Sequence, residues 1–391
     1  MPAAAPLPAA LPRLLYLLML CNLVLGTGVF VLGGILVPIS ESLRVSVSAA
    51  GQAMTAYAVS TALLAPLMLV FTGRWPRRTA LVAGLLLFAL GSLVCALAQS
   101  LVVLLAGRVL MGMGAMYTPI SGGIAVALVA PAQRGRALSL VFLGISLSYV
   151  VGMPLGAWLG LRYGWQWPVA LVALAALVAA LALTVLLPKQ IAAPGASFTG
   201  LPGLLAQPAV ASTLAVTLLY FCAIFLVFSY IGPVLQALVP MAAEWMSFTL
   251  MLFGLAGVTG TLVGGWANDR FGAPRTLPVQ LAVLASMMVL VPLTKGHYPA
   301  LVAVFVAWGV AGFGMMAPQQ SRLAALSPAQ TPILLSINSS MLYLGTAAGA
   351  ALGGAVAGTV GFARLSWVGV PFALVALAVL QFSLRQTSAR P

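Results

Sequence analysis

The chain has 391 residues, of which 63% are hydrophobic and only 5% are charged, and its formal net charge is +14. A water-soluble surface needs about a quarter of charged residues, so this composition excludes a soluble protein and indicates a polytopic membrane protein. The longest polar-leaning segment, 188–208, is too short for a soluble domain of roughly 50 residues. Because the basic residues are scattered singly between apolar runs, a nucleic-acid-binding surface is not expected.

Apolar runs long enough to cross a bilayer, about 20 residues each, recur along the whole chain when breaks are placed at Gly, Pro and charged positions. They predict an all-α fold of twelve transmembrane helices. The first run continues past Pro38, which favours a transmembrane helix over a cleaved signal peptide. The expected limits are 14–38, 48–72, 79–98, 101–128, 137–160, 166–187, 209–236, 245–267, 275–294, 299–322, 331–358 and 363–384.

The basic residues of alternate loops predict the orientation, because loops rich in Lys and Arg stay in the cytoplasm. One side of the membrane receives four of them, namely Arg44, Arg162, Lys295 and Arg364. The other side receives twelve, namely Arg13, Arg74, Arg77, Arg78, Arg134, Arg136, Lys189, Arg270, Arg275, Arg322, Arg385 and Arg390. Both termini are therefore predicted to be cytoplasmic in a bacterial inner membrane.

Three features recur at nearly constant separation along the chain. The loop 72–81, TGRWPRRTAL, has a near copy at 268–277, NDRFGAPRTL, with their arginines Arg74 and Arg270 196 residues apart. Pro38 and Pro233 are separated by 195 residues. A glycine ladder in the fifth span recurs after 193 residues in the eleventh; its members are Gly152, Gly156 and Gly160, then Gly345, Gly349 and Gly353.

These offsets predict two pseudo-symmetric six-helix bundles, at 1–187 and 209–391, joined by a cytoplasmic linker at 188–208. Parallel repeats of six spans are a known plan of secondary transporters, in which the substrate is held between the halves near the midplane.

The segments together resemble the major facilitator superfamily, and within it the drug:proton antiporter branch that includes sugar and nucleoside exporters. The two loops 72–81 and 264–277 resemble the family's motif between spans two and three and its partner between spans eight and nine. GRVLMGMGA at 107–115 resembles the fourth-span motif built on an arginine, and GMPLG at 152–156 resembles the fifth-span antiporter motif. The resemblance implies a twelve-helix exporter that works by proton antiport.

The chain departs from the family pattern in its acidic residues. Gly73 stands where the loop motif usually has Asp, and Val29 stands where many relatives carry an acid in span one. The three acids, Glu41, Glu244 and Asp269, all fall at span ends or loops. Coupling through a buried carboxylate is therefore not supported, and Glu41 or Asp269, or the substrate gradient alone, are the alternatives.

Arg108 is the one basic residue placed inside a predicted span, seven residues from its start. A charge there costs at least about 2.5 kcal/mol, so it should face the protein interior and have partners. Two interpretations stay open: backbone carbonyls and water satisfy its five donors, or an anionic, zwitterionic or polyhydroxylated substrate supplies the missing acceptor.

Other polar groups at cavity depth are expected to bind substrate as well, because Tyr and Asn supply hydrogen bonds that fix a ligand's orientation. Packing within the helix bundle is the alternative for each of them. These residues are Asn22, Tyr57, Tyr117, Tyr220, Tyr230, Asn338 and Tyr343.

Two groups of residues are predicted to take part in gating. Charged residues at cytoplasmic helix ends are predicted to latch that side, because their arginines can bond to carbonyls that become exposed as the bundles rock. The alternative is that they only anchor the topology. This group comprises Arg74, Arg77, Arg78, Asp269 and Arg270. Gly152, Pro154 and Gly156 form a bent, bare helix face suited to a sliding seam, with tight static packing as the alternative.

Enzymatic chemistry is not expected, because His297 is the single histidine and no paired acids lie inside a span. The chain has no GxxxxGK[ST] motif for ATP, and Cys21, Cys95 and Cys222 lie within apolar runs as small buried residues. Neither a metal site nor a cofactor is predicted.

The sequence thus predicts an inner-membrane secondary transporter that exports a small polar or anionic metabolite or drug by alternating access, coupled to protons as the resemblance implies. It is expected to be a monomer whose partners are the substrate, protons and the lipid bilayer. An importer or facilitator of an anionic metabolite or metal chelate is one alternative. A transport-inactive sensor or scaffold is the other.

Overall fold

The computed structural model describes residues 13–130, 133–189, 191, 206–327 and 330–388, and within them every regular element is a helix. The linker predicted at 188–208 lies largely outside the described residues. The first bundle contains α1 (Arg13–Gly34), α2 (Leu36–Leu43), α3 (Val47–Phe71), α4 (Arg77–Ala96), α5 (Leu101–Gly114), α6 (Tyr117–Ala127), α7 (Arg134–Leu147), α8 (Met153–Tyr163) and α9 (Gln166–Leu186). The second contains α11 (Pro208–Phe228), α12 (Ile231–Leu238), α13 (Ala243–Phe271), α14 (Ala273–Leu290), α15 (Tyr298–Gly314), α16 (Met316–Leu326), α17 (Thr331–Val360) and α18 (Leu365–Ser388).

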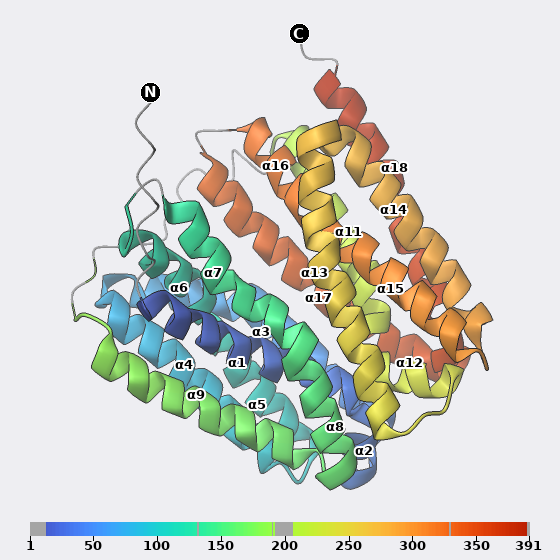
Figure 1. The fold of residues 1–391 in the computed structure, drawn as a ribbon, viewed down its shortest axis with the longest axis horizontal. Coiled ribbons are helices and arrows are strands. Elements are labelled where there is room, and N and C mark those ends of the chain that lie inside the picture. The colour runs from blue at the N-terminus through green and yellow to red at the C-terminus, as the bar shows by residue number, and fades with distance from the viewer. Residues whose placement is uncertain (1–12, 131–132, 190, 192–205, 328–329, 389–391) are drawn as a thin grey trace, which may run out of the picture.

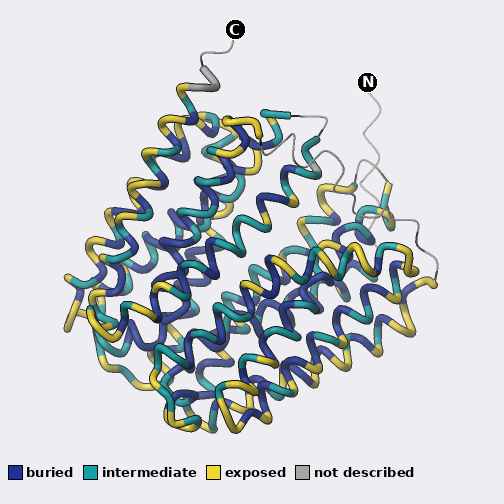
Figure 2. The backbone as a smooth tube through the Cα atoms, turned by 180° about the vertical axis from the view of Figure 1, so that it is seen from behind, coloured by how far each residue is buried: buried dark blue, intermediate teal, exposed yellow. Residues whose placement is uncertain are grey.

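Twelve stretches of the described chain are long and apolar enough to cross a membrane, which confirms the predicted number. A helix is the natural solution because each backbone N–H and C=O then bonds within its own segment. Large apolar side chains such as Leu67, Val185 and Leu262 are exposed on the outer surface, where lipid would cover them. Figure 2 shows this exposed layer around a buried interior.

The predicted spans one and seven are each broken into a long and a short helix. The breaks fall at Ile35 and Tyr230, whose backbone angles are nearly equal (φ −122°, ψ 21° and φ −117°, ψ 26°). Each break lies three residues before a proline, Pro38 or Pro233, which lacks the N–H that would continue the helix. The two breaks are 195 residues apart, as the repeat requires. Spans four and ten are divided similarly, α5 from α6 and α15 from α16.

The two bundles lie against each other at one end of the molecule and diverge toward the other (Figure 1). The end where they meet carries α2, α8 and α12 and is called the closed end below. At the opposite end α1 begins and α18 ends. The basic residues predicted to be cytoplasmic lie at this opposite end, except Arg390, which is outside the described residues.

Bare backbone brings the two bundles together at the closed end. A Cβ atom on Gly232 would lie 2.7 Å from the carbonyl oxygen of Gly34, and one on Gly33 would lie 3.2 Å from that of Phe228. The breaks in spans one and seven therefore cross each other without side chains between them. Only glycine permits so close a backbone approach.

Polar contacts add to this closure. The Ser247 hydroxyl of α13 donates a 2.9 Å hydrogen bond to the carbonyl of Pro154 in α8. Arg162, at the end of α8, lies 3.6 Å from the Glu244 carboxylate at the start of α13. Both contacts connect the same two helices, one from each bundle, so they hold shut the edge at which α8 meets α13.

The glycine ladders pack inside their own bundles and not between them. In the first bundle the ladder faces α1, pairing Gly152 with Thr27, Gly156 with Val31 and Gly160 with Ile35. In the second it faces α11, pairing Gly345 with Leu218, Gly349 with Cys222 and Gly353 with Leu226. The geometry corresponds to the static-packing interpretation, and of the three predicted seam residues Pro154 contacts the other bundle through its carbonyl.

Candidate functional site

A turn of π-helix interrupts the fifth span between α7 and α8, at Ser148–Gly152 (η3). Its cause is Pro154, which cannot donate to the carbonyl of Val150, so that the Met153 N–H bonds instead to Ser148, five residues back. Single π-turns inside α-helices are frequent at functional sites. This turn presents Tyr149 to the interface between the bundles.

Tyr149 is the centre of an aromatic cluster formed by both bundles. Its ring stacks on Phe30 of α1 at 4.3 Å between centroids and meets Phe313 of α15 edge-on at 5.0 Å. Phe228 of α11 lies 6.0 Å from both Phe30 and Tyr149, and Phe253 of α13 lies 5.5 Å from Phe228. Offset and edge-on pairs of this kind are the favourable arrangements for aromatic rings.

A small hollow of about 30 Å³, which is space for water, lies beside this cluster between the bundles. It is lined by Ser146 and Tyr149 from the first bundle and by Gly254, Gly257, Val258, Thr261 and Phe313 from the second. None of these lining side chains is charged. The glycines permit close packing: a Cβ on Gly254 would overlap the Tyr149 carbonyl oxygen, so α13 lies directly against the π-turn.

Two more tyrosines, Tyr57 of α3 and Tyr343 of α17, lie on a pair of helices where the bundles also touch. Tyr149 and Tyr343 are half-buried, and neither hydroxyl bonds to a described residue. Neither Tyr57 nor Tyr343 is among the residues that line the hollow.

Arg108 is fully buried inside the first bundle, with all five of its N–H groups directed at acceptors. Nε donates to the Ala53 carbonyl at 3.1 Å, and the terminal nitrogens donate to the carbonyls of Gly28 at 2.9 Å and Val29 at 3.0 Å. The two remaining N–H groups point at the sulfur atoms of Met111 and Met54.

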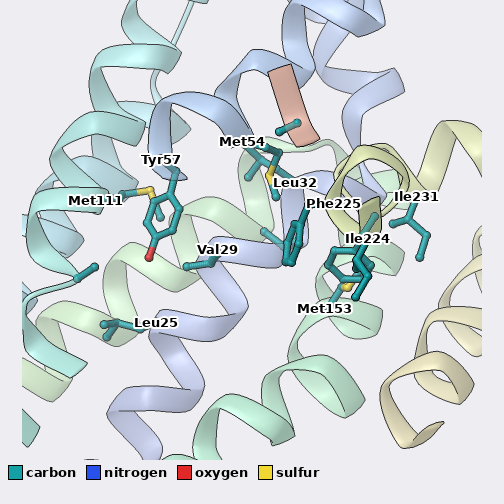
Figure 3. Packing of buried hydrophobic residues seen from close by; sticks show 14 of the residues in the cluster. Leu25, Val29, Leu32, Met54, Tyr57, Met111, Met153, Ile224, Phe225 and Ile231 are labelled. Carbon is teal, nitrogen blue, oxygen red and sulfur yellow. The ribbon is translucent and has the colours of Figure 1, made fainter. Parts of the chain in front are cut away.

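Tyr57 covers the guanidinium group, with its ring centroid 4.9 Å from the Arg108 Cζ atom. Figure 3 shows the Tyr57 ring between Met111 and Val29. A desolvated cation is tolerated only when its donors are satisfied, and here carbonyl oxygens use their second lone pairs for that purpose. The geometry therefore corresponds to the backbone-carbonyl interpretation of Arg108 and does not require a substrate anion.

Asn22 and Tyr117 lie within the first bundle, away from the lining of the hollow. The Asn22 amide donates to the Val141 carbonyl at 3.1 Å and to the Ser121 hydroxyl at 3.4 Å, which ties α1 to α6 and α7. Tyr117 is fully buried. Both residues pack helices together in this conformation.

Asn338 and Tyr220 belong to a polar seam inside the second bundle. Thr217 donates to the Asn338 amide oxygen at 2.6 Å and accepts from the Gln319 amide at 3.0 Å. The Tyr220 hydroxyl points at the Met316 sulfur, 3.3 Å away. These contacts connect α11, α16 and α17 within one bundle.

Tyr230 lies at the closed end and not beside the hollow. It is fully buried, and its hydroxyl donates to the Ala350 carbonyl at 3.0 Å. Its ring fits against Gly51 of α3 in the other bundle, where a Cβ would overlap the ring, and against Gly353 and Gly354 of α17. Its position is therefore that of a wedge between α3 and α17.

The residues predicted to latch the opposite end do not join the bundles in this conformation. Arg77 donates to the carbonyl of Gly73, and Arg78 donates to that of Leu187, both within the first bundle. The remaining three, Arg74, Asp269 and Arg270, are exposed. The single ion pair among the described residues is the one between Arg162 and Glu244, so a latch at this end would have to form in another conformation.

Tyr149, the residue on which the hollow depends, is absent from the sequence-based set of binding residues. Its signal is present, since it is a mid-span tyrosine three residues before the glycine ladder and five before Pro154. What the sequence does not reveal is the π-turn, which decides the face of the helix on which Tyr149 lies.

Two bundles of membrane-spanning helices that meet at one end and diverge toward the other have the architecture of a membrane transporter. The sequence matches the family model of the Major Facilitator Superfamily over residues 18–328 and 240–391. The chain belongs to this superfamily.

Similar proteins agree with this assignment. The chain is 30% identical over 366 residues to the inner membrane transport protein YdhP of Escherichia coli K12, and the match covers 93% of both chains. It is 27% identical over 364 residues to the uncharacterized MFS-type transporter YbcL of Bacillus subtilis, again over 93% of both.

Two solved structures share the fold. One is a bacterial homologue of the human lysosomal transporter Spinster in an inward-facing and occupied conformation, with a TM-score of 0.82 at 16% identity over 95% of this chain and 96% of that one. The other is the human organic anion transporter MFSD10, with a TM-score of 0.67 at 19% identity over 94% and 97%. At these identities the likeness concerns the fold alone.

Proposed function

We propose that this chain exports a small molecule across a bacterial inner membrane by alternating access, with both termini in the cytoplasm. The observation that carries the proposal is the closure at one end only. The bundles meet through bare backbone, Tyr230 and the α8–α13 contacts at that end, and they diverge toward the other. A carrier loads its cargo from the side on which its bundles stand apart.

The distribution of basic residues supports the orientation. Eleven of the twelve predicted cytoplasmic bases are described, all but Arg390, and they lie at the diverging end. By the positive-inside tendency this end faces the cytoplasm. The conformation is then open to the cytoplasm, and the proposed direction of export rests on the resemblance to exporters of the drug:proton antiporter branch.

The acidic residues support a carrier driven by the gradient of its own substrate. Glu41, Glu244 and Asp269 are the only acids of the chain, and all three are exposed at helix ends. A carboxylate that exchanges a proton for substrate has to be reachable from the cavity in both conformations. We therefore propose that proton antiport, which the resemblance implies, does not operate through these acids.

The two bundles, 1–187 and 209–391, are proposed to rock as rigid bodies within a monomer, with 188–208 as their cytoplasmic link. Each bundle has internal ties that would survive such a motion, namely Arg108 in the first and the Asn338 seam in the second. The substrate and the lipid bilayer are the expected partners.

The test is counterflow of labelled substrate in right-side-out and inverted vesicles, using a pair of cysteines introduced at Arg162 and Glu244 in a background without native cysteines. Cross-linking this pair fixes the closed end, so counterflow should stop and resume after reductive cleavage of the link. Transport that continues in the cross-linked protein would contradict alternating access. Faster uptake driven by an imposed pH gradient would contradict the proposed driving force, and no transport of any compound would favour a sensor or scaffold.

A further inference from the structure

Arg322 of α16 is a second buried arginine, and it lies at the diverging end of the second bundle (Figure 1). Only 7% of the residue is exposed. One terminal nitrogen, Nη2, donates to the Ser383 hydroxyl of α18. The other, Nη1, is buried and has no hydrogen-bond partner in the described chain. A buried charged donor without an acceptor is costly, so this atom indicates a missing group.

A chain of hydroxyl groups fixes the direction of this arginine. The Ser383 hydroxyl lies 2.7 Å from that of Ser212 in α11, which in turn donates to the Ala209 carbonyl at 3.2 Å. Thr213 donates to the same carbonyl at 2.7 Å. With Ser383 accepting from Arg322 and donating to Ser212, the chain holds Nη2 in place between α11, α16 and α18. Nη1 is left as the free donor.

The surroundings of Arg322 differ from those of Arg108. Three backbone carbonyls and two sulfur atoms face the donors of Arg108, whereas Nη1 of Arg322 has no such partner. None of the three acids forms an ion pair with Arg322, since the ion pair of the described chain joins Arg162 to Glu244. The described chain therefore supplies neither an acceptor nor a carboxylate for this nitrogen.

The first bundle has no counterpart of this arginine. Subtracting the repeat offsets of 193 to 196 residues from 322 gives 126–129, a stretch that contains only Val, Ala and Leu. A bundle of this kind therefore folds without a charge at this place. The arginine points to a function that belongs to the second bundle alone.

The buried nitrogen lies close to the surface of the diverging end. Gln320 and Ser321, the two residues before Arg322, are exposed, and so is Ala211 beside Ser212. A group that enters between α11, α16 and α18 from this end therefore has a short path to Nη1.

We propose that Arg322 binds the phosphate group of an anion that enters the second bundle from the diverging end. Arginine forms strong charge-assisted hydrogen bonds with phosphate, and basic pockets between membrane helices bind lipid head groups. The anion is either free phosphate or an anionic lipid head group. The residues that line the hollow beside Tyr149 come from other elements, so this site is separate from the hollow and does not depend on the export function.

The test is the melting temperature of the purified protein in inorganic phosphate, with the ionic strength held constant by chloride salt. Phosphate should raise it with increasing concentration. Arg322→Gln should weaken the phosphate affinity at least about tenfold, because the charge-assisted hydrogen bond is lost. Arg385→Gln is the matched control, since it removes the same charge from an exposed position of α18, and it should change the affinity less than about twofold.

A measurement on the unaltered protein keeps the site testable even if Arg322→Gln does not fold. Phosphate should slow amide hydrogen exchange in 208–213, 316–326 and 380–388, the segments that surround Arg322, and leave exchange in α5 unchanged. Slower exchange in other helices without these three segments would overturn the site.

Lipid nanodiscs separate the two sources of phosphate. In phosphatidylcholine discs the protein should respond to added phosphate when the site takes the free ion. In phosphatidylglycerol discs it should be stabilised without added phosphate when a lipid occupies the site, and Arg322→Gln should abolish either effect. Equal responses of Arg322→Gln and Arg385→Gln would overturn the site. No response to phosphate or to phosphatidylglycerol would mean that water alone satisfies Nη1, which would also overturn it.

Discussion

Replacing Gly51 by alanine should open the closed end of this transporter. The added Cβ would overlap the Cε1 atom of Tyr230 and lie 2.5 Å from its hydroxyl oxygen. Tyr230 belongs to the other bundle, and its ring cannot retreat, because its far side faces the backbone of Gly353 and Gly354 and its hydroxyl is bonded to Ala350. The clash exists only while the closed end is shut.

The size of the effect follows from this geometry. Overpacking a buried site costs about 1–3 kcal/mol, and here the cost applies to one conformation only. At about 1.4 kcal/mol for each factor of ten, the ratio of open to shut molecules should rise about 5- to 150-fold. The higher helix propensity of alanine, worth about 1 kcal/mol, acts equally on both conformations and cancels.

The measurement is the distance distribution between spin labels at two exposed closed-end positions, Arg44 in the first bundle and Arg364 in the second. Gly51→Ala should add or enlarge a population at longer distance. Gly358→Ala is the matched control, because Gly358 lies in α17 and a Cβ atom added there would meet no other atom within 4 Å. If Gly51→Ala and Gly358→Ala give the same distribution, the wedge role of Tyr230 is refuted.

Further outcomes test the other elements of the structure. Arg108→Leu should lower the free energy of unfolding by about 2 kcal/mol through lost charged hydrogen bonds, as thermal denaturation can measure. Counterflow by the folded variant should persist, and a selective loss of counterflow would restore the substrate role of the arginine. Glu244→Gln removes an exposed ion pair worth about 0–1 kcal/mol, so the ratio of open to shut molecules, measured from the spin-label distances, should change less than about fivefold. A larger change would show that this ion pair is a main contact holding the closed end together. Pro154→Ala supplies an N–H donor for the Val150 carbonyl, so the π-turn should revert to α-helix and turn Tyr149 away from Phe30 and Phe313. Counterflow should then fall about tenfold, and unchanged counterflow would show that the turn does not position the site.

Much of the fold could be predicted because the bilayer imposes strong rules on sequence. Uninterrupted apolar runs fix the number of spans, and the repeat offsets fix the relation between the halves. The breaks at Ile35 and Tyr230 are not predicted, although Pro38 and Pro233 stand close to them in the sequence. A proline removes one hydrogen bond, but whether a helix bends or breaks there depends on its neighbours, in this case the backbone of the opposite break at Gly232.

The candidate site was harder to predict, because a one-dimensional pattern gives the depth of a residue but not its direction. Asn22 and Tyr230 are at plausible depths, yet one faces its own bundle and the other the closed end. The sequence does identify Arg108 as a buried charge. The choice between its two interpretations needed the positions of the α1 and α3 carbonyls, which sequence does not give.

The π-turn at Ser148–Gly152 lets one membrane span both line the hollow and pack against the first span. An α-helix rotates by about 100° for each residue, so a wider turn changes the direction in which the side chains after it point. After the turn, Gly156 and Gly160 keep their contact with Val31 and Ile35, while Ser146 before the turn and Tyr149 within it line the hollow. Positions that line the hollow are thereby separated from those that pack against the first span, so a substitution at Tyr149 need not disturb that packing.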